Sequence, residues 1–406
     1  MPQQGQERQI GHRTFPTRSD TELALLVGVE RKASNRWWSA EDSLQELSVL
    51  AETAGARVVG TLIQKLQAPS STHYIRKGKL TELISLKKQS PYDTVIFDDE
   101  LSPRQQRNLE ETLQAKVIDR TALILDIFAR QARTHEGRLQ VELAQHQYLL
   151  PRLIGQWSHL ERLGGGIGTR GPGESQLETD RRLINRRINR LRHEIEDVRR
   201  HRSLYRRRRK ELAMPIVALV GYANAGKSTL FNTLSRAGVV AEDTLFSTLD
   251  PVTRRLILSD GQRLLITDTV GFVQKLPPSI TAAFRATLEE LSDADLLLHI
   301  IDITHRHAAN QCRTVEEVLA ELQLQDKPRI TLFNKLDLAL GGEQEMETLT
   351  NIPFSEREIT LPDANIALIS ATKGWGIGGL VDKIAAHIGN DSNEPLLSRP
   401  FLLGSR

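Results

Sequence analysis

Over the first third of the chain, short apolar runs alternate with longer segments in which apolar residues recur at the helical period. Short runs that are apolar on both faces are typical of strands buried in a parallel sheet. The strand candidates are residues 23–29, 56–63, 94–97 and 116–118. Helical patterns occupy residues 40–54, 77–88, 102–113 and 119–128. This alternation of strand and helix predicts a parallel α/β subdomain.

The end of the third strand carries three acidic residues, Asp98, Asp99 and Glu100. Carboxylates after a strand commonly lie in a solvated turn or cap the next helix. We interpret them in this way, and we expect no catalytic site in this part of the chain.

A long helical hairpin is predicted in the middle of the chain. Its first helix, residues 139–163, places leucines at compatible helical spacing, and its second carries a heptad stripe that only Arg181 and Arg202 interrupt. The apolar positions are Leu139, Leu143, Leu150 and Leu153 on the first helix and Leu177, Ile184, Ile188, Leu191, Ile195, Val198 and Tyr205 on the second. Two antiparallel helices would bury these stripes against each other and leave the arginines outside.

A glycine-rich connection joins the two helices. It contains Gly164, Gly165, Gly166, Gly168 and Arg170, and the sequence after it is typical of a helix-capping box. One interpretation is a flexible linker. Another is that glycines let the backbone approach a crowded RNA surface closely, with Arg170 beside it. The spacing leaves both interpretations open.

After the hairpin, a phosphate-binding loop follows an apolar strand at residues 215–220 and precedes an amphipathic helix at 228–234. The pattern G-x-x-x-x-G-K-[ST] is met by Gly221, Tyr222, Ala223, Asn224, Ala225, Gly226, Lys227 and Ser228. In this context the backbone N–H groups of the loop cradle phosphates, and Lys227 stabilises charge on the β- and γ-phosphates. The Ser228 hydroxyl is placed to bind Mg²⁺, and Thr229 extends the loop at the helix start. The sequence therefore predicts binding of a nucleoside triphosphate.

Two later segments predict how the terminal phosphate is sensed. Asp268, Thr269, Val270 and Gly271 follow an apolar strand, so that the carboxylate can reach the Mg²⁺ shell and the glycine N–H can meet the γ-phosphate. Thr248 lies in a polar connection of the kind that orders over Mg²⁺ and the γ-phosphate. We therefore expect Ser228, Thr248 and Asp268 to form the metal site.

The base is predicted from two further runs. Asn334, Lys335 and Asp337 follow the apolar strand 330–333, and Ser370, Ala371 and Thr372 follow the strand 366–369. A carboxylate at Asp337 accepts from guanine N1–H and N2–H₂, whereas adenine offers it no such pair of donors. The second run would bring a backbone N–H to guanine O6. The order of these runs resembles the base-reading elements of translation-factor-type GTPases, so we expect a Ras-like GTPase domain and GTP hydrolysis.

Phe272 follows Gly271, at the position where Ras-like GTPases carry a glutamine that orients the attacking water. A phenyl ring cannot do this, so we expect slow intrinsic hydrolysis that a partner or a cation stimulates. Asn224 matches the asparagine that helps to hold a monovalent cation in potassium-activated relatives. We therefore consider K⁺, besides Mg²⁺, as a cofactor; a role for Asn224 within its own loop is an equal alternative.

The charge distribution along the chain points to a partner rich in phosphate. The chain of 406 residues has a net charge of +3, yet residues 181–210 hold fourteen basic and three acidic residues, a net +11. Because arginine predominates and acidic residues are sparse, nucleic-acid contact is favoured over a merely solvated face. The arginines we expect to touch RNA are Arg181, Arg182, Arg186 and Arg187.

Length and composition complete the expected organisation. A chain of this length exceeds one typical domain, and its single cysteine, Cys312, fits a reducing cytoplasm. It has no apolar run long enough to span a membrane and no secretory leader pattern, and we expect a monomer. We divide it into a disordered segment 1–20, an α/β subdomain 21–136, the basic hairpin 137–210, the GTPase domain 211–389 and a tail 390–406.

The run from Gly164 to Arg182, followed by a phosphate-loop domain, resembles the HflX family of ribosome-associated GTPases over roughly residues 21–389. The resemblance implies binding to the large ribosomal subunit and its RNA, a hairpin tip that enters the peptidyl-transferase region, hydrolysis stimulated by the ribosome, and splitting or rescue of stalled ribosomes. Many members carry a further small domain after the Ras-like domain. Here only the tail follows, which puts that domain's functions in doubt.

Two alternatives stay open from the sequence. One is an assembly or checkpoint GTPase that uses GTP only as a timer for ribosome binding. The other is an RNA-stimulated NTPase that also accepts ATP. Both retain the phosphate loop. Under the first alternative, ribosomal subunits would not separate. Under the second, Asp337 would not select the base.

Overall fold

The N-terminal part of the chain forms a four-stranded sheet that is parallel throughout, in the order β2-β1-β3-β4. The computed structural model describes residues 21–31, 38–163, 172–211, 214–235, 245–246, 248–258, 261–277, 280, 291–340 and 365–391. The strands are β1 (Leu23–Arg31), β2 (Arg57–Leu66), β3 (Thr94–Phe97) and β4 (Lys116–Asp119). The helices are α1 (Ala40–Thr53), α2 (Lys77–Gln89), α3 (Pro103–Leu113) and α4 (Arg120–Gln131).

Local sequence explains where these helices begin. Ser102 caps α3 in a full capping box with Gln105, and Pro103 takes the first helical position, where its missing N–H costs nothing. Asp119 ends β4 and caps α4 by accepting the N–H of Ala122 at 2.9 Å. The predicted order of strands and helices is confirmed here, with ends that differ by a few residues.

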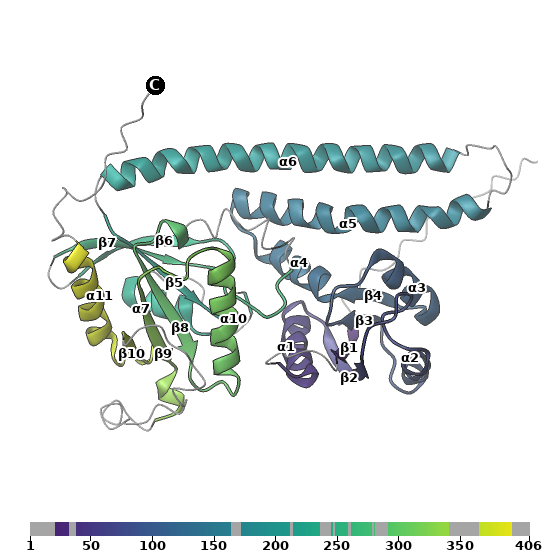
Figure 1. The fold of residues 1–406 in the computed structure, drawn as a ribbon, viewed down its shortest axis with the longest axis horizontal. Helices are drawn as coiled ribbons and strands as arrows, with labels where there is room; N and C mark the ends of the chain where they lie inside the picture. Colours follow the sequence, from purple (N-terminus) through teal and green to yellow (C-terminus); the bar gives the residue numbers. More distant parts are fainter. Residues whose placement is uncertain are drawn as a thin grey trace, which may run out of the picture.

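The predicted antiparallel hairpin is formed by α5 (His135–Leu163) and α6 (Pro172–Glu211), which lie above both sheets in Figure 1. The two helices bury a shared apolar seam, and α5 also packs on α3 and α4. The buried seam residues are Leu139, Leu143, Ile188, Leu191 and Ile195, with Leu150, Ile184 and Val198 packed against them. The glycine-rich connection lies outside the described residues, as do segments 1–20 and 392–406.

The C-terminal part forms a six-stranded sheet in the order β10-β9-β8-β5-β7-β6. Its strands are β5 (Ile216–Gly221), β6 (Val252–Ile257), β7 (Arg263–Asp268), β8 (Leu296–Asp302), β9 (Arg329–Asn334) and β10 (Ile366–Leu368). Its described helices include α7 (Lys227–Ser235), α10 (Ala308–Glu321) and α11 (Ile377–Asp391). Among the described strands of this sheet, only β6 runs antiparallel, on the edge beside β7. The mixed α/β class with parallel sheets is confirmed.

The interpretation of the acidic turn after β3 was wrong for Asp98 and holds for Glu100. The side chain of Asp98 is only 2% exposed and forms ion pairs with Arg120 and Lys275, while that of Asp99 is 15% exposed. Glu100 is exposed. Asp98 is buried because Ser43, Arg120 and Lys275 surround it, and these contacts cannot be read from local sequence. Among the described helices, none combines the length and apolar character that a membrane span requires.

Candidate functional site

The phosphate loop connects β5, in the middle of the second sheet, to the start of α7. Its glycines are required by close contacts. A Cβ on Gly221 would lie 2.4 Å from the Ile300 carbonyl oxygen. Gly226 has a φ of +96°, and a Cβ there would lie 2.3 Å from Nδ2 of Asn334. The loop therefore packs directly on β8 and on the residue that ends β9.

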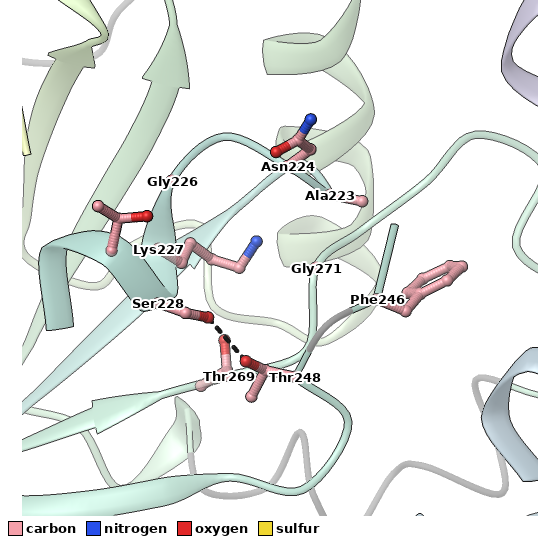
Figure 2. Close-up of a pocket in the computed structure, with 10 residues that line it drawn as sticks. Ala223, Asn224, Gly226, Lys227, Ser228, Phe246, Thr248, Thr269 and Gly271 are labelled. Carbon is pink, nitrogen blue, oxygen red and sulfur yellow. Dashed lines mark hydrogen bonds between the residues drawn. The ribbon is translucent and has the colours of Figure 1, made fainter. Parts of the chain in front are cut away.

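Lys227 lies in the pocket that the loop encloses, as Figure 2 shows. Its side chain is 6% exposed, and Nζ donates to the carbonyl oxygens of Tyr222 at 2.8 Å and Gly221 at 3.3 Å. Burial lowers the pKa of Lys227 to about 8, although the nearby Asp268 opposes this. A phosphate group would favour the charged form, because it supplies the anion that the buried ammonium needs.

The side chains of Ser228, Thr248 and Asp268 converge on one point. The two hydroxyl oxygens lie 2.7 Å apart, and they lie 2.7 Å and 3.0 Å, respectively, from Oδ2 of Asp268. Oδ1 of Asp268 is buried and has no hydrogen-bond partner among the described residues. Burial raises the pKa of this carboxyl group. Hydroxyl and carboxylate oxygens are ligands that Mg²⁺ prefers, so this cluster and its unpartnered oxygen fit a divalent cation.

We call residues 268–275 the second switch segment. Thr269 donates from Oγ1 to the Leu219 carbonyl at 2.5 Å, and Val270 is 7% exposed. A Cβ on Gly271 would lie 2.7 Å from the Ala223 Cα and 2.9 Å from Nζ of Lys227, so only glycine fits against the loop backbone here. Phe272 donates its N–H to Gly221 and accepts the N–H of Ala223 at 2.7 Å. Its ring is 1% exposed within the hydrophobic core, where it cannot orient a water molecule.

The residues predicted to read the base lie together at the other end of the loop. Asn334 donates from Nδ2 to the Ala225 carbonyl at 2.9 Å and accepts the Ala371 N–H at 3.0 Å. Ser370 donates from Oγ to Oδ1 of Asp337 at 2.6 Å. The two runs are thus joined to each other and to the phosphate loop.

Of the remaining predicted loop residues, Lys335 has left-handed backbone geometry and pairs with Asp302 at 2.9 Å. Asn224 also has a positive φ, 63°, and is exposed on the loop. Thr229 lines the pocket, whereas Thr372 is exposed beside Ala371.

Segment 245–250, which we call the first switch segment, contains two site residues that the sequence analysis missed. Phe246 lines the pocket with Thr248 (Figure 2), and its ring lies edge-on to Phe128 of α4 at 4.7 Å between centroids. Asp250 contacts the residues that precede α5. Within this segment, Ser247 lies outside the described residues. No local signal could have found these two residues, because their partners lie more than a hundred positions away.

The arginines expected to touch RNA lie on α6. Arg181, Arg182 and Arg186 are exposed. Arg187 differs, since its guanidinium forms a two-point contact with Glu142 of α5 at 2.7 and 2.8 Å. Gly164, Gly165, Gly166, Gly168 and Arg170 lie outside the described residues.

Comparisons with known proteins cover both sheets and the hairpin. Residues 41–129 match a family model described as GTP-binding GTPase N-terminal, residues 131–209 one described as GTP-binding GTPase middle region, and residues 216–335 one described as 50S ribosome-binding GTPase. A GTPase HflX from Caldanaerobacter subterraneus is 51% identical over 319 residues, which cover 79% of this chain and 73% of the relative.

One further relative and one solved structure are also similar to this chain. A GTPase HflX from Escherichia coli is 46% identical over 359 residues, which cover 88% of this chain and 82% of that protein. A crystal structure of a GTP-binding protein from Sulfolobus solfataricus in complex with GDP is 25% identical, with a TM-score of 0.45; the match covers 91% of this chain and 99% of that one.

Proposed function

The chain belongs to the HflX family of GTPases, and from this premise we propose that it is a cytoplasmic, monomeric enzyme whose nucleotide state controls how its basic hairpin holds ribosomal RNA. The family description for residues 216–335 names the 50S ribosome as the partner. The exposed arginines of α6 provide the charge that RNA phosphates require. We further propose that the GTP form binds the large subunit and splits stalled ribosomes.

For hydrolysis, we assign charge stabilisation to Lys227 and contact with the γ-phosphate to the Gly271 N–H. Ser228, Thr248 and Asp268 would hold Mg²⁺, which, when bound, neutralises charge on the β- and γ-phosphates. The Asp337 carboxylate and the run 370–372 would hold guanine. Since Phe272 is buried in the core, it cannot position the attacking water, and we propose that the ribosome supplies the group that does.

The observation that carries the proposal is a contact between the first switch segment and the base of the hairpin. Oδ2 of Asp250 accepts the backbone N–H groups of Arg133 and Thr134, both at 2.8 Å. Oδ1 of Asp250 lies 2.5 Å from the Thr134 hydroxyl, and α5 begins at the next residue. Backbone N–H groups at the start of a helix have no carbonyl of an earlier turn to donate to. The Asp250 carboxylate accepts from such N–H groups and interacts favourably with the positive end of the helix dipole.

Because Asp250 lies two residues after Thr248, movement of Thr248 toward Mg²⁺ and the γ-phosphate would move this contact. The Phe246–Phe128 ring contact and a bond of 3.5 Å from Gln131 to the Leu245 carbonyl tie the same segment to α4. Nucleotide-dependent ordering of residues 245–250 would thus reach the hairpin directly.

We expect Gly137→Ala to weaken the dependence of ribosome binding on nucleotide. A Cβ at position 137 would lie 2.1 Å from Oδ1 of Asp250 and displace the carboxylate, whereas alanine favours the helix itself. In ribosome pelleting, wild type should bind about tenfold more tightly with a GTP analogue than with GDP. An affinity ratio of this size is typical of allosteric coupling. The variant should lose most of this ratio. Gly78→Ala is the matched control, because a Cβ there meets nothing within 4 Å.

Equal affinity of wild type for ribosomes in the nucleotide-free, GDP and GTP-analogue states would refute the switch. Sedimentation of intact ribosomes with the protein and a GTP analogue tests splitting separately. Undivided ribosomes carrying bound protein would favour the assembly or checkpoint alternative.

We also propose that K⁺ assists hydrolysis beside Asn224, which the loop presents to solvent with a φ of 63°. A monovalent cation there would add positive charge near the phosphates, as an arginine finger does in other GTPases. Ribosome-stimulated turnover should be roughly tenfold faster in potassium than in sodium salts, and Asn224→Ala should remove the difference. Identical rates of wild type in the two salts would exclude this role.

A further inference from the structure

Three side chains that carry metal-binding atoms meet between β8 and α10. His299 lies on β8, while Cys312 and Glu316 lie on α10, which packs against β8 (Figure 1). Residues four positions apart on a helix project from the same face. One ligand atom from each of the three side chains lies within 4.8 Å of the other two. None of these residues lines the phosphate pocket, so the cluster is separate from the nucleotide site.

The imidazole of His299 is buried and free to act as a ligand. The side chain is 1% exposed, and neither ring nitrogen has a hydrogen-bond partner within the part of the chain that the structure describes. Nδ1 lies 3.6 Å from Oε1 of Glu316, which is too far for a hydrogen bond. Buried polar groups are nearly always paired, so this imidazole is an exception that needs an explanation. Burial keeps the ring neutral, which is the form that binds metal ions.

Glu316 is oriented from outside the cluster. Arg329, the first residue of β9, donates from Nη1 to both of its carboxylate oxygens at 2.6 Å. Nη2 of Arg329 donates to the Gln325 carbonyl, also at 2.6 Å. Carboxylates that bind metals are commonly held by outer hydrogen bonds of this kind, and each oxygen keeps a further lone pair for an ion. The Glu316 side chain is 28% exposed, so it forms the open edge of the cluster.

The ligand atoms determine which metal the cluster suits. Imidazole nitrogen, thiolate sulfur and carboxylate oxygen are ligands of Zn²⁺, whereas Mg²⁺ prefers oxygen alone. Cys312 is 4% exposed beside apolar residues, and burial raises the pKa of its thiol to about 12. The thiol is therefore protonated without a metal, but a bound zinc ion deprotonates a coordinating thiol. The thiolate and Glu316 would balance the two charges of the ion.

We propose that His299, Cys312 and Glu316 form a binding site for a transition-metal ion of the Zn²⁺ type. Ligands bound to one zinc ion at about 2.0–2.3 Å lie roughly 3–4 Å apart, so the cluster would need to contract only slightly. The ion would tie α10 to the middle of the second sheet. His299 is in register with Val220, directly before the phosphate loop, and with Thr331 of β9. The site therefore braces strands that lead to the nucleotide pocket, and it depends on neither hydrolysis nor ribosome binding.

The first test uses Co²⁺ as a coloured substitute for Zn²⁺. It is added to the untagged, reduced full chain, with Mg²⁺ and GDP present to fill the nucleotide site. Because Cys312 is the only cysteine of the chain, absorption from sulfur-to-cobalt charge transfer can arise only through this residue. We expect this absorption to saturate at one Co²⁺ per chain and to disappear as Zn²⁺ competes for the same ligands. Absence of the absorption at saturating Co²⁺ would overturn the proposal.

Glu316→Gln separates the full cluster from binding by the thiol alone. Glutamine keeps an oxygen that can accept from Arg329 but removes the charge, and Co²⁺ affinity should fall about tenfold or more. Glu317→Gln is the matched control, because this neighbouring residue of α10 is exposed. It should bind Co²⁺ as wild type does. Equal affinity in wild type and Glu316→Gln would contradict the assigned site.

Thermal unfolding shows whether the folded chain holds the ion. Zn²⁺ at a hundred times its dissociation constant should raise the unfolding midpoint of wild type by about 5 °C, since a ligand that binds only the folded state stabilises it. Cys312→Ala, which suits the apolar surroundings, should show no such rise. An unchanged midpoint in wild type, or the same rise in Cys312→Ala, would overturn the proposal, because the ion would then bind the unfolded chain or other groups.

Discussion

Asp337→Asn is expected to change the preferred base from guanine to xanthine. Guanine presents two donors, N1–H and N2–H₂, to the Asp337 carboxylate, whereas the asparagine amide can accept from only one of them and opposes its own donor to the other. Xanthine carries a carbonyl oxygen in place of the amino group and pairs with the amide. Affinity for GTP should fall on the order of 10³-fold, since sites built on such hydrogen bonds discriminate by 10⁴ or more.

Titration of wild type and variant with fluorescent GDP and XDP measures this directly. The substitution should leave the local structure unchanged, because Ser370 donates to Oδ1 of Asp337 at 2.6 Å and an asparagine keeps an oxygen that can accept this bond. Asp382→Asn, at an exposed position of α11, controls for the loss of one charge. Unchanged GTP affinity in Asp337→Asn would mean that this carboxylate does not read the base, and use of ATP would then have to be reconsidered.

Replacing Arg181, Arg182 and Arg186 together with glutamine is expected to weaken ribosome binding on the order of 10²-fold near physiological salt. Each exposed guanidinium that neutralises a phosphate releases counterions, so the slope of log affinity against log salt should flatten by roughly 0.7–0.9 per lost contact. Ribosome pelleting across a salt series gives both quantities. Arg187 is left in place because its pairing with Glu142 joins the two hairpin helices.

The matched control removes three positive charges elsewhere: Lys77, Lys88 and Arg104 are exposed on the N-terminal subdomain. Their replacement by glutamine should alter affinity only slightly. Similar losses in the two triple variants would show that net charge, rather than the α6 face, determines binding, and the hairpin would lose its assigned role.

Much of the site could be predicted from sequence because each of its motifs is local. The phosphate loop needs Gly221 and Gly226 at fixed spacing between a strand and a helix, and both the spacing and the context are visible in the chain. The seam of the hairpin was predicted for the same reason, because periodicity alone places Ile188, Leu191 and Ile195 on one face.

Strands of unusual composition were not found. The edge strand β6 contains Arg254 and Arg255 with little burial, so its pattern reads as a loop. The central strand β8 is buried throughout but carries His299. Burial, together with Arg329 and Lys227, lowers the pKa of His299 to about 3, so this histidine is neutral in the core. A single sequence does not reveal that a polar side chain will be neutral and buried.

Contacts between distant parts of the chain were also beyond sequence reasoning. Asp98 was assigned to a solvated turn because its partner Lys275 lies far along the chain. The contacts of Asp250 with Thr134 and of Tyr222 with Glu46 could not be predicted for the same reason, because these partners are also distant in the sequence. These contacts depend on how the two sheets pack against each other.

The paired charges at Asp98 and Lys275 also constrain how the gene can change. Loss of Lys275 would leave Asp98 paired with Arg120, and loss of Asp98 would leave Lys275 paired with Asp99, so a substitution at either position weakens the network without leaving a charge alone. We therefore expect that exchanging either half of the polypeptide for an unrelated module would remove these ion pairs.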